Sequence, residues 1–174
     1  MSDLFEILNK LDEIKYGWMD INGEIHLNTM KDFRKIYKTM SINTALEKKI
    51  GICMEQVFYT HLLLDEKKIP NKMFCTRIYE DENFNDLDAH EHMHCFSLCY
   101  IGNDVYHIEH ANQEERGIYK YSSEEEAISK INAYYEALDK GHARPVTEFF
   151  DVPVGLTFKE FNLYINSLGE YKIK

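Results

Sequence analysis

Apolar side chains recur every three or four residues in several stretches of the chain, which is the spacing of one face of a helix. Residues 3–15 follow this spacing and predict an amphipathic helix that Ser2 or Asp3 caps. A shorter helix is predicted within residues 29–40, and a helical turn is predicted after the polar cap residue Ser41. The N-terminal region is therefore expected to be mainly helical.

The central helix is predicted from Cys53 to Lys68, because its apolar side chains fall mostly on one face. Pro70 ends this run, since the residue before a proline is disfavoured in the helical conformation. Two more helices are predicted over residues 122–140 and 157–168, the second beginning with a capping box. We expect the helix at Cys53 to be the buried one.

After Pro70 the apolar pattern changes to a period of two, which is typical of strands. The predicted strands cover residues 73–80, 93–101, 105–111, 118–121 and 145–150. Gly102-Asn103 predicts the turn between the second and third of these strands, and Asn22-Gly23 predicts an earlier turn between short extended pieces. Residues 81–92, which are acidic and rich in histidine, are expected to form a loop at the end of the sheet.

This order of elements indicates an α+β fold in which the central helix packs on an antiparallel sheet with flanking helices. The 174 residues suffice for one hydrophobic core and are too few for two comfortable ones. We expect a single domain over residues 1–174, with a core of about residues 41–121 on which the N-terminal helical region and the C-terminal helices pack.

The formal net charge of −10 argues against nucleic acid or an anionic membrane surface as a partner, because both would be repelled. The first six residues lack the basic and apolar blocks of a signal peptide, and no segment reaches the roughly 20 apolar residues of a membrane span. A cytoplasmic protein is therefore expected, and its oligomeric state is left open.

Cys53 is the first candidate for chemistry, because it opens the predicted central helix two residues after Gly51. Unpaired backbone N–H groups and the positive end of the helix dipole favour a thiolate at this position. The same N–H groups can hold an oxyanion, and Gly51 would let a substrate approach the thiol. The alternative is that Cys53 is a small buried hydrophobic residue, as most isolated cysteines are.

His94 and Glu109 are the candidates on the predicted sheet. If Ile101 pairs with Asp104 across the Gly102-Asn103 turn, His94 and Glu109 become diagonal neighbours on one face, where the helix end can meet them. A carboxylate there can orient an imidazole that takes the proton of a thiol. A shift of one residue would separate them, and the alternative is a surface pair at a strand end.

This arrangement resembles the transglutaminase-like superfamily of cysteine hydrolases, within the papain-like class. The resemblance rests on Gly51-Ile52-Cys53 opening a helix, on His94-Cys95-Phe96 on a strand, and on an acid after a Gly-Asn turn. Tyr16-Gly17 is similar to a motif of its small bacterial members. The family usually has tryptophan where Phe96 stands, aspartate where Glu109 stands and proline where His110 stands.

The resemblance implies that Cys53 is the nucleophile, His94 the general base and acid, and Glu109 the group that orients it. The implied function is a cysteine-dependent hydrolase or acyl transferase, peptidase-like, that acts on an amide or ester of a peptide or another substrate without a cofactor. A noncatalytic binding module that retains the fold is the alternative. The spacing leaves open whether an oxyanion donor or substrate wall comes from three further residues, which are Gln56, Trp18 and Asn43.

A metal site is the competing interpretation of the histidines. His90, His92 and His94 share one face if their stretch is extended, and imidazoles with a carboxylate suit zinc or iron. Three more potential ligands on the next predicted strand are His107, Glu109 and His110. We expect no metal, because the long central helix does not suit a β-barrel metalloprotein and no second ligand motif follows.

Overall fold

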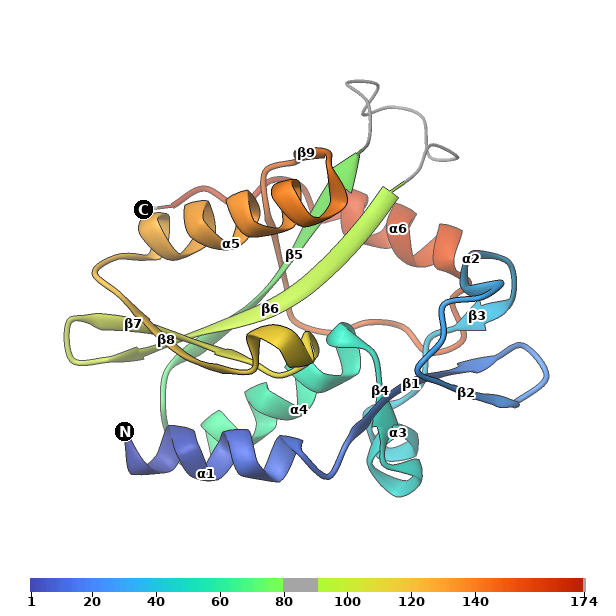
Figure 1. Cartoon of the computed structure of the whole chain (residues 1–174), viewed down its shortest axis with the longest axis horizontal. Coiled ribbons are helices and arrows are strands. Elements are labelled where there is room, and N and C mark those ends of the chain that lie inside the picture. Colours follow the sequence, from blue (N-terminus) through green and yellow to red (C-terminus); the bar gives the residue numbers. More distant parts are fainter. Residues whose placement is uncertain (80–90, 174) are drawn as a thin grey trace.

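The structure is a computed structural model that describes residues 1–79 and 91–173. It is a mixed α+β fold in which a six-stranded sheet forms the centre (Figure 1). The strands of this sheet are β5 (Asn71–Tyr79), β6 (Glu91–Ile101), β7 (Asp104–Glu109), β8 (Gly117–Tyr121), β9 (His142–Ala143) and β10 (Thr147–Phe149). Their order is β10-β5-β6-β7-β8, with β9 also on β5, and every pair is antiparallel.

Helices cover both faces of this sheet (Figure 1). The helices α1 (Ser2–Leu11) and α4 (Cys53–Glu66) pack on one face, where leucines of both helices contact Cys99, Tyr106 and Ile108. The helix α5 (Glu124–Asp139) packs on the other face, against Phe96 and Leu98. Three of the predicted helices thus form two layers, one on each face of the predicted strands.

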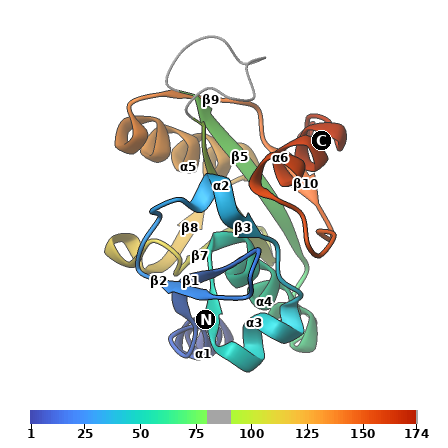
Figure 2. The same ribbon diagram turned by 90° about the vertical axis from the view of Figure 1, so that its right-hand side faces the viewer.

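A small sheet holds the chain just before α4. Its strands are β1 (Lys15–Asp20), β2 (Ile25–Leu27), β3 (Tyr37–Lys38) and β4 (Ile50–Gly51). The strand β4 pairs in parallel with β1, so that Gly51 lies opposite Tyr16. Figure 2 shows this sheet on the near side of the molecule together with α2 (Phe33–Ile36), whereas α3 (Ile42–Lys48) lies below it. The segment that leads into Cys53 is therefore fixed by backbone hydrogen bonds.

Local sequence explains where the central helix begins and ends. Ile52 is extended, and its N–H donates to the Glu55 carboxylate at 3.0 Å, which caps the start of α4. The helix ends at Glu66, two residues before the predicted end, because Lys68 takes a left-handed conformation ahead of Pro70. The last helix, α6 (Phe158–Ser167), has the predicted capping box at Thr157.

Several predicted bounds were wrong by a few residues. The first helix ends at Leu11 rather than at residue 15, because β1 starts at Lys15 and takes up the following residues. The strand β7 ends at Glu109 rather than at residue 111. The predicted loop over residues 81–92 lies mostly outside the described residues, and its last two residues belong to β6. No described helix has the length and apolar character needed to cross a membrane.

We expect Phe74→Ala to lower the free energy of unfolding by about 3–5 kcal/mol, because Phe74 is fully buried between the sheet and α5 and the change leaves a cavity. Urea unfolding followed by circular dichroism would measure this loss. Phe150→Ala is the matched control, since this side chain is 75% exposed and the same change there should stay within about 0.5 kcal/mol. Equal losses in both variants would contradict the burial described here.

Candidate active site

Cys53 is the first residue of α4 and lines a cleft on the surface of the molecule. Its side chain is 8% exposed, so the thiol is nearly buried but reachable from the cleft. The structure shows a different reason from the predicted one for a glycine at position 51. A Cβ at Gly51 would lie 2.9 Å from the Cβ of Glu55, so the glycine makes room for the capping glutamate rather than for a substrate.

The predicted register between β6 and β7 is confirmed. Ile101 pairs with Asp104, and the ladder runs to the pair of Leu98 with His107. The Nε2 atom of His94 lies 3.0 Å from the Oε2 atom of Glu109, and both side chains are buried. The His94 nitrogen is not directed at the oxygen as in a well-formed hydrogen bond, so the contact is best described as an ion pair.

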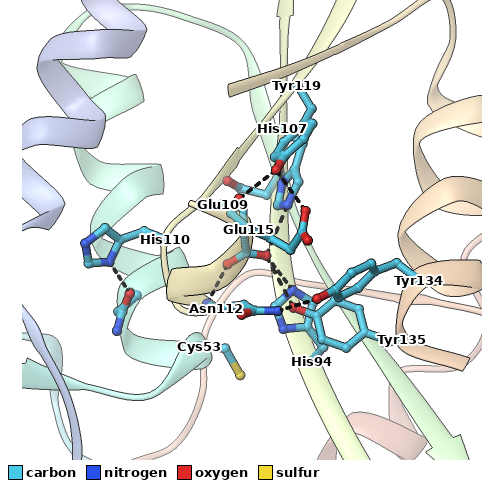
Figure 3. Close-up of polar contacts among 12 residues, drawn as sticks. Cys53, His94, His107, Glu109, His110, Asn112, Glu115, Tyr119, Tyr134 and Tyr135 are labelled. Atoms are coloured by element: carbon cyan, nitrogen blue, oxygen red, sulfur yellow. Dashed lines mark hydrogen bonds and ion pairs between the residues drawn. The ribbon is translucent and has the colours of Figure 1, made fainter. Parts of the chain in front are cut away.

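The start of α4 brings the thiol of Cys53 to His94. His94 and Phe96 point to the face that α5 covers, whereas α4 packs on the opposite face, against Cys95 and Cys99. The helix therefore approaches His94 with its N-terminal end, as expected from the sequence, and not with its body. Figure 3 shows Cys53, the first residue of α4, beside His94 and below the carboxylate of Glu109.

Several groups besides His94 hold the Glu109 carboxylate (Figure 3). Its Oε1 atom accepts the backbone N–H of Asn112 at 3.0 Å, and its Oε2 atom is 3.3 Å from His107 Nε2 and 3.4 Å from the Tyr135 hydroxyl. The Nδ1 atom of His107 donates to a backbone carbonyl 3.1 Å away. These contacts fix the direction of the carboxylate toward His94.

Tyr135 completes the surroundings of the imidazole. Its ring stacks on that of His94 with 3.9 Å between the ring centroids. No signal in the sequence indicated this role. The role of His107 could have been found from the strand period, because residues 107 and 109 share a face.

The pKa values of the three candidate side chains are all shifted toward the charged forms. The pKa of the Cys53 thiol is lowered well below its usual value, chiefly by interaction with the Cys95 thiol and then with His94, against the effect of burial. Burial lowers the pKa of His94, but Glu109 and Cys53 outweigh it and raise the pKa to about 10. Burial raises the pKa of Glu109, and the charge of His94 with the His107 hydrogen bond brings it well below its usual value.

The cleft has a volume of about 810 Å³ and apolar inner walls with charged residues at its rim. Its walls come from the segment around α2, the start of α4, the strand β6, the end of α5 and the start of α6. The apolar residues that line it include Tyr16, Met30, Phe33, Leu138, Phe158 and Phe161. Such a cleft can exclude water from a reacting group at Cys53 while it accepts an apolar part of a substrate.

None of the three weaker candidates lines this cleft. The side-chain amide of Gln56 donates to the Gly51 carbonyl at 2.9 Å, and its oxygen contacts His110 at 2.6 Å. Trp18 is fully buried and donates to the carbonyl of Thr29. Asn43 is an exposed residue of α3. The Gln56 side chain therefore holds the backbone just before Cys53 by a hydrogen bond and does not face the cleft.

The structure places the histidines of the alternative metal site in different surroundings. His90 lies outside the described residues, and His92 is 3.3 Å from Asp139 at the rim of the cleft. Two other groups of described residues bring metal-binding atom types within 4.8 Å of one another, and they are His94, His107, Glu109 and Asp20, Glu24, His26. The first group overlaps the ion pair beside Cys53, and the second is hydrogen-bonded within the β1–β2 turn.

Glu55 is a second buried carboxyl group close to the thiol. It is 2% exposed, it contacts the Tyr37 hydroxyl at 3.5 Å and the Ile52 N–H at 3.0 Å, and it has a further backbone hydrogen bond at Met40. Burial raises its pKa to about 8, so Glu55 is protonated at neutral pH. The start of α4 is thus capped by a neutral acid, which does not repel a thiolate.

Comparisons with protein-family models, with curated proteins and with solved structures found no match. The chemistry of the site is therefore inferred from its own geometry.

Between pH 4.5 and about 8 we expect the unfolding free energy of the wild-type protein to fall by about 2–4 kcal/mol more than that of Glu55→Gln. In this range the folded state keeps a proton on Glu55 that the unfolded state has released, so stability falls as pH rises. Glutamine cannot titrate and can still cap Ile52. Urea unfolding at several pH values would measure the difference. Glu160→Gln, at the same capping position of α6 but exposed, should leave the pH profile unchanged.

We expect iodoacetamide to alkylate Cys53 at neutral pH faster than a model thiol, because its lowered pKa keeps it as a thiolate. His94→Ala should slow this reaction about tenfold or more, since it removes the cation that stabilises the thiolate. Peptide mass spectrometry would give the rate at each cysteine. His92→Ala is the matched control, two residues along the same strand. If His94→Ala left the rate unchanged, the thiolate would not depend on this imidazole.

Proposed function

We propose that the protein is a cysteine-dependent hydrolase or acyl transferase that acts on an amide or ester, with Cys53, His94 and Glu109 as its catalytic set. The observation that carries this proposal is the ion pair of a buried histidine and glutamate beside a cysteine that lines a cleft at a helix N-terminus. The shifts of all three pKa values toward charged forms support it further.

In the proposed reaction the Cys53 thiolate attacks the carbonyl carbon of the substrate. The backbone N–H groups of Cys53 and Met54 in the first turn of α4 have no partner within the helix, and both residues line the cleft. They are suited to hold the tetrahedral oxyanion. The His94 imidazolium then gives its proton to the leaving group, which produces a thioester on Cys53.

Water or an amine would resolve the thioester, with His94 taking the proton of the attacking molecule. Glu109 balances the charge of the imidazolium, and its contacts with Asn112 and His107 keep it in place during both steps. Hydrolysis needs only a water molecule in the cleft. The proposed substrates are peptides or other amides and esters, and the reaction requires no cofactor.

We also propose that the chain is a member of the transglutaminase-like superfamily of the papain-like class. The support is the order of its parts: a cysteine at the start of a helix that packs on an antiparallel sheet, followed by a histidine and an acid on neighbouring strands. Phe96 and Glu109 stand where that family usually has tryptophan and aspartate. A glutamate can serve because either carboxylate can pair with an imidazolium.

The alternative is a noncatalytic module that binds a ligand in the same cleft. Both functions would use the apolar walls, so the lining residues do not separate them. The difference lies in the thiol, because a binding module has no need of a covalent intermediate.

We expect p-nitrophenyl acetate to give a burst of one equivalent of p-nitrophenol and an acetyl group on Cys53 that mass spectrometry detects after an acid quench. Cys53→Ser should abolish the burst. His94→Ala should lower its rate by about 10²–10⁴-fold, and Glu109→Gln by less, because glutamine still fills the site but carries no charge.

Rapid alkylation of Cys53 without acylation by this ester or by peptide thioesters would favour the binding module. A burst that survived in Cys53→Ser would assign the reaction to another residue and contradict the proposal.

A further inference from the structure

Two further cysteines, Cys75 and Cys95, lie on the side of Cys53 that faces away from His94. Cys75 and Cys95 are directly opposite each other on β5 and β6, and both belong to the same packed cluster as Cys53. All three are free thiols. The catalytic set uses only one of them, and the cleft is lined by Cys53 and Cys95 together.

Cys95 is placed to react with an oxidised Cys53. Its thiol interacts with Cys53 on one side and with Cys75 on the other, and these interactions raise the pKa of Cys95 well above its usual value. Cys95 is therefore kept as a thiol while its neighbour Cys53 is a thiolate. This is the arrangement of a peroxide-reactive cysteine beside a resolving cysteine.

We propose that Cys53 and Cys95 form an oxidation site for hydrogen peroxide and small organic hydroperoxides, in which Cys53 is oxidised and Cys95 resolves it as a disulfide. The inference concerns the same thiol as the proposed function and rests on its reactivity.

The first step is attack of the Cys53 thiolate on one peroxide oxygen. The O–O bond breaks, hydroxide leaves, and Cys53 becomes a sulfenic acid with the loss of two electrons to the peroxide. The Cys95 sulfur then attacks the Cys53 sulfur. The S–O bond breaks, the hydroxyl leaves with the Cys95 proton as water, and the Cys53–Cys95 disulfide forms. The disulfide blocks the nucleophile, and a dithiol restores it.

Peroxide treatment of the whole protein, followed by mapping of disulfide-linked peptides, tests this inference directly. We expect the Cys53–Cys95 disulfide, loss of Cys53 alkylation, and recovery of that alkylation with dithiothreitol. In Cys95→Ser we expect no such disulfide and loss of the recovery, because Cys53 proceeds to sulfinic acid.

Cys99→Ser is the matched control. Cys99 lies on the same strand and face as Cys95 and is equally buried, but it packs against α1 in another cluster. This variant should form the disulfide at the wild-type rate.

Three outcomes would overturn the inference: a Cys75–Cys95 disulfide in place of the expected one, direct conversion of wild-type Cys53 to sulfinic acid, or an unchanged recovery in Cys95→Ser. Each can be told from a failure of the proposed function. If Cys53 is alkylated rapidly before peroxide treatment but never forms the disulfide after it, Cys53 remains the proposed nucleophile and the proposed oxidation site is wrong. If untreated Cys53 alkylates no faster than a model thiol, the proposed function fails first.

Discussion

The burial of three ionised side chains in one place is the constraint on which the rest of this site depends. A thiolate, an imidazolium or a carboxylate alone in a protein interior is strongly unfavourable, and it becomes tolerable only beside an opposite charge with further hydrogen bonds. His94 lies between Cys53 and Glu109 and carries the charge that both need. The surrounding elements have to hold this histidine, which explains the Tyr135 ring stacked on it and the His107 contact to its partner.

The two buried carboxyl groups near the thiol are kept in opposite states by their surroundings. Glu109 faces two imidazoles and a backbone N–H, so it stays ionised. Glu55 faces a tyrosine hydroxyl and backbone N–H groups that include the one it caps, with no cation among these contacts, so burial keeps it neutral. Environments that separate two acids in this way are common where proton transfer occurs. The effect is that α4 is capped without a negative charge that would compete with Cys53.

Much of the fold could be predicted from the sequence, because its signals are local. The Gly102-Asn103 turn fixed the register that brings His94 and Glu109 together, and the capping box at Thr157 fixed the start of α6. The sheet face on which α4 packs could not be predicted, because both faces of β6 are apolar and buried. The role of Gly51 was missed for a related reason: the contact that requires a glycine is with the Glu55 side chain, whose direction depends on the tertiary structure.

The choice of sheet face has a consequence for the chemistry. Because α4 packs on the face opposite to His94, only the first residue of the helix reaches the imidazole, and the thiol of Cys53 stands between two different environments. On one side is a charged pair that suits proton transfer, and on the other are the thiols of Cys95 and Cys75. Had the helix covered the His94 face, the histidine would lie over its apolar side chains and Cys95 would point away from the nucleophile. The same packing thus gives Cys53 both a partner for acyl transfer and a neighbour for oxidation.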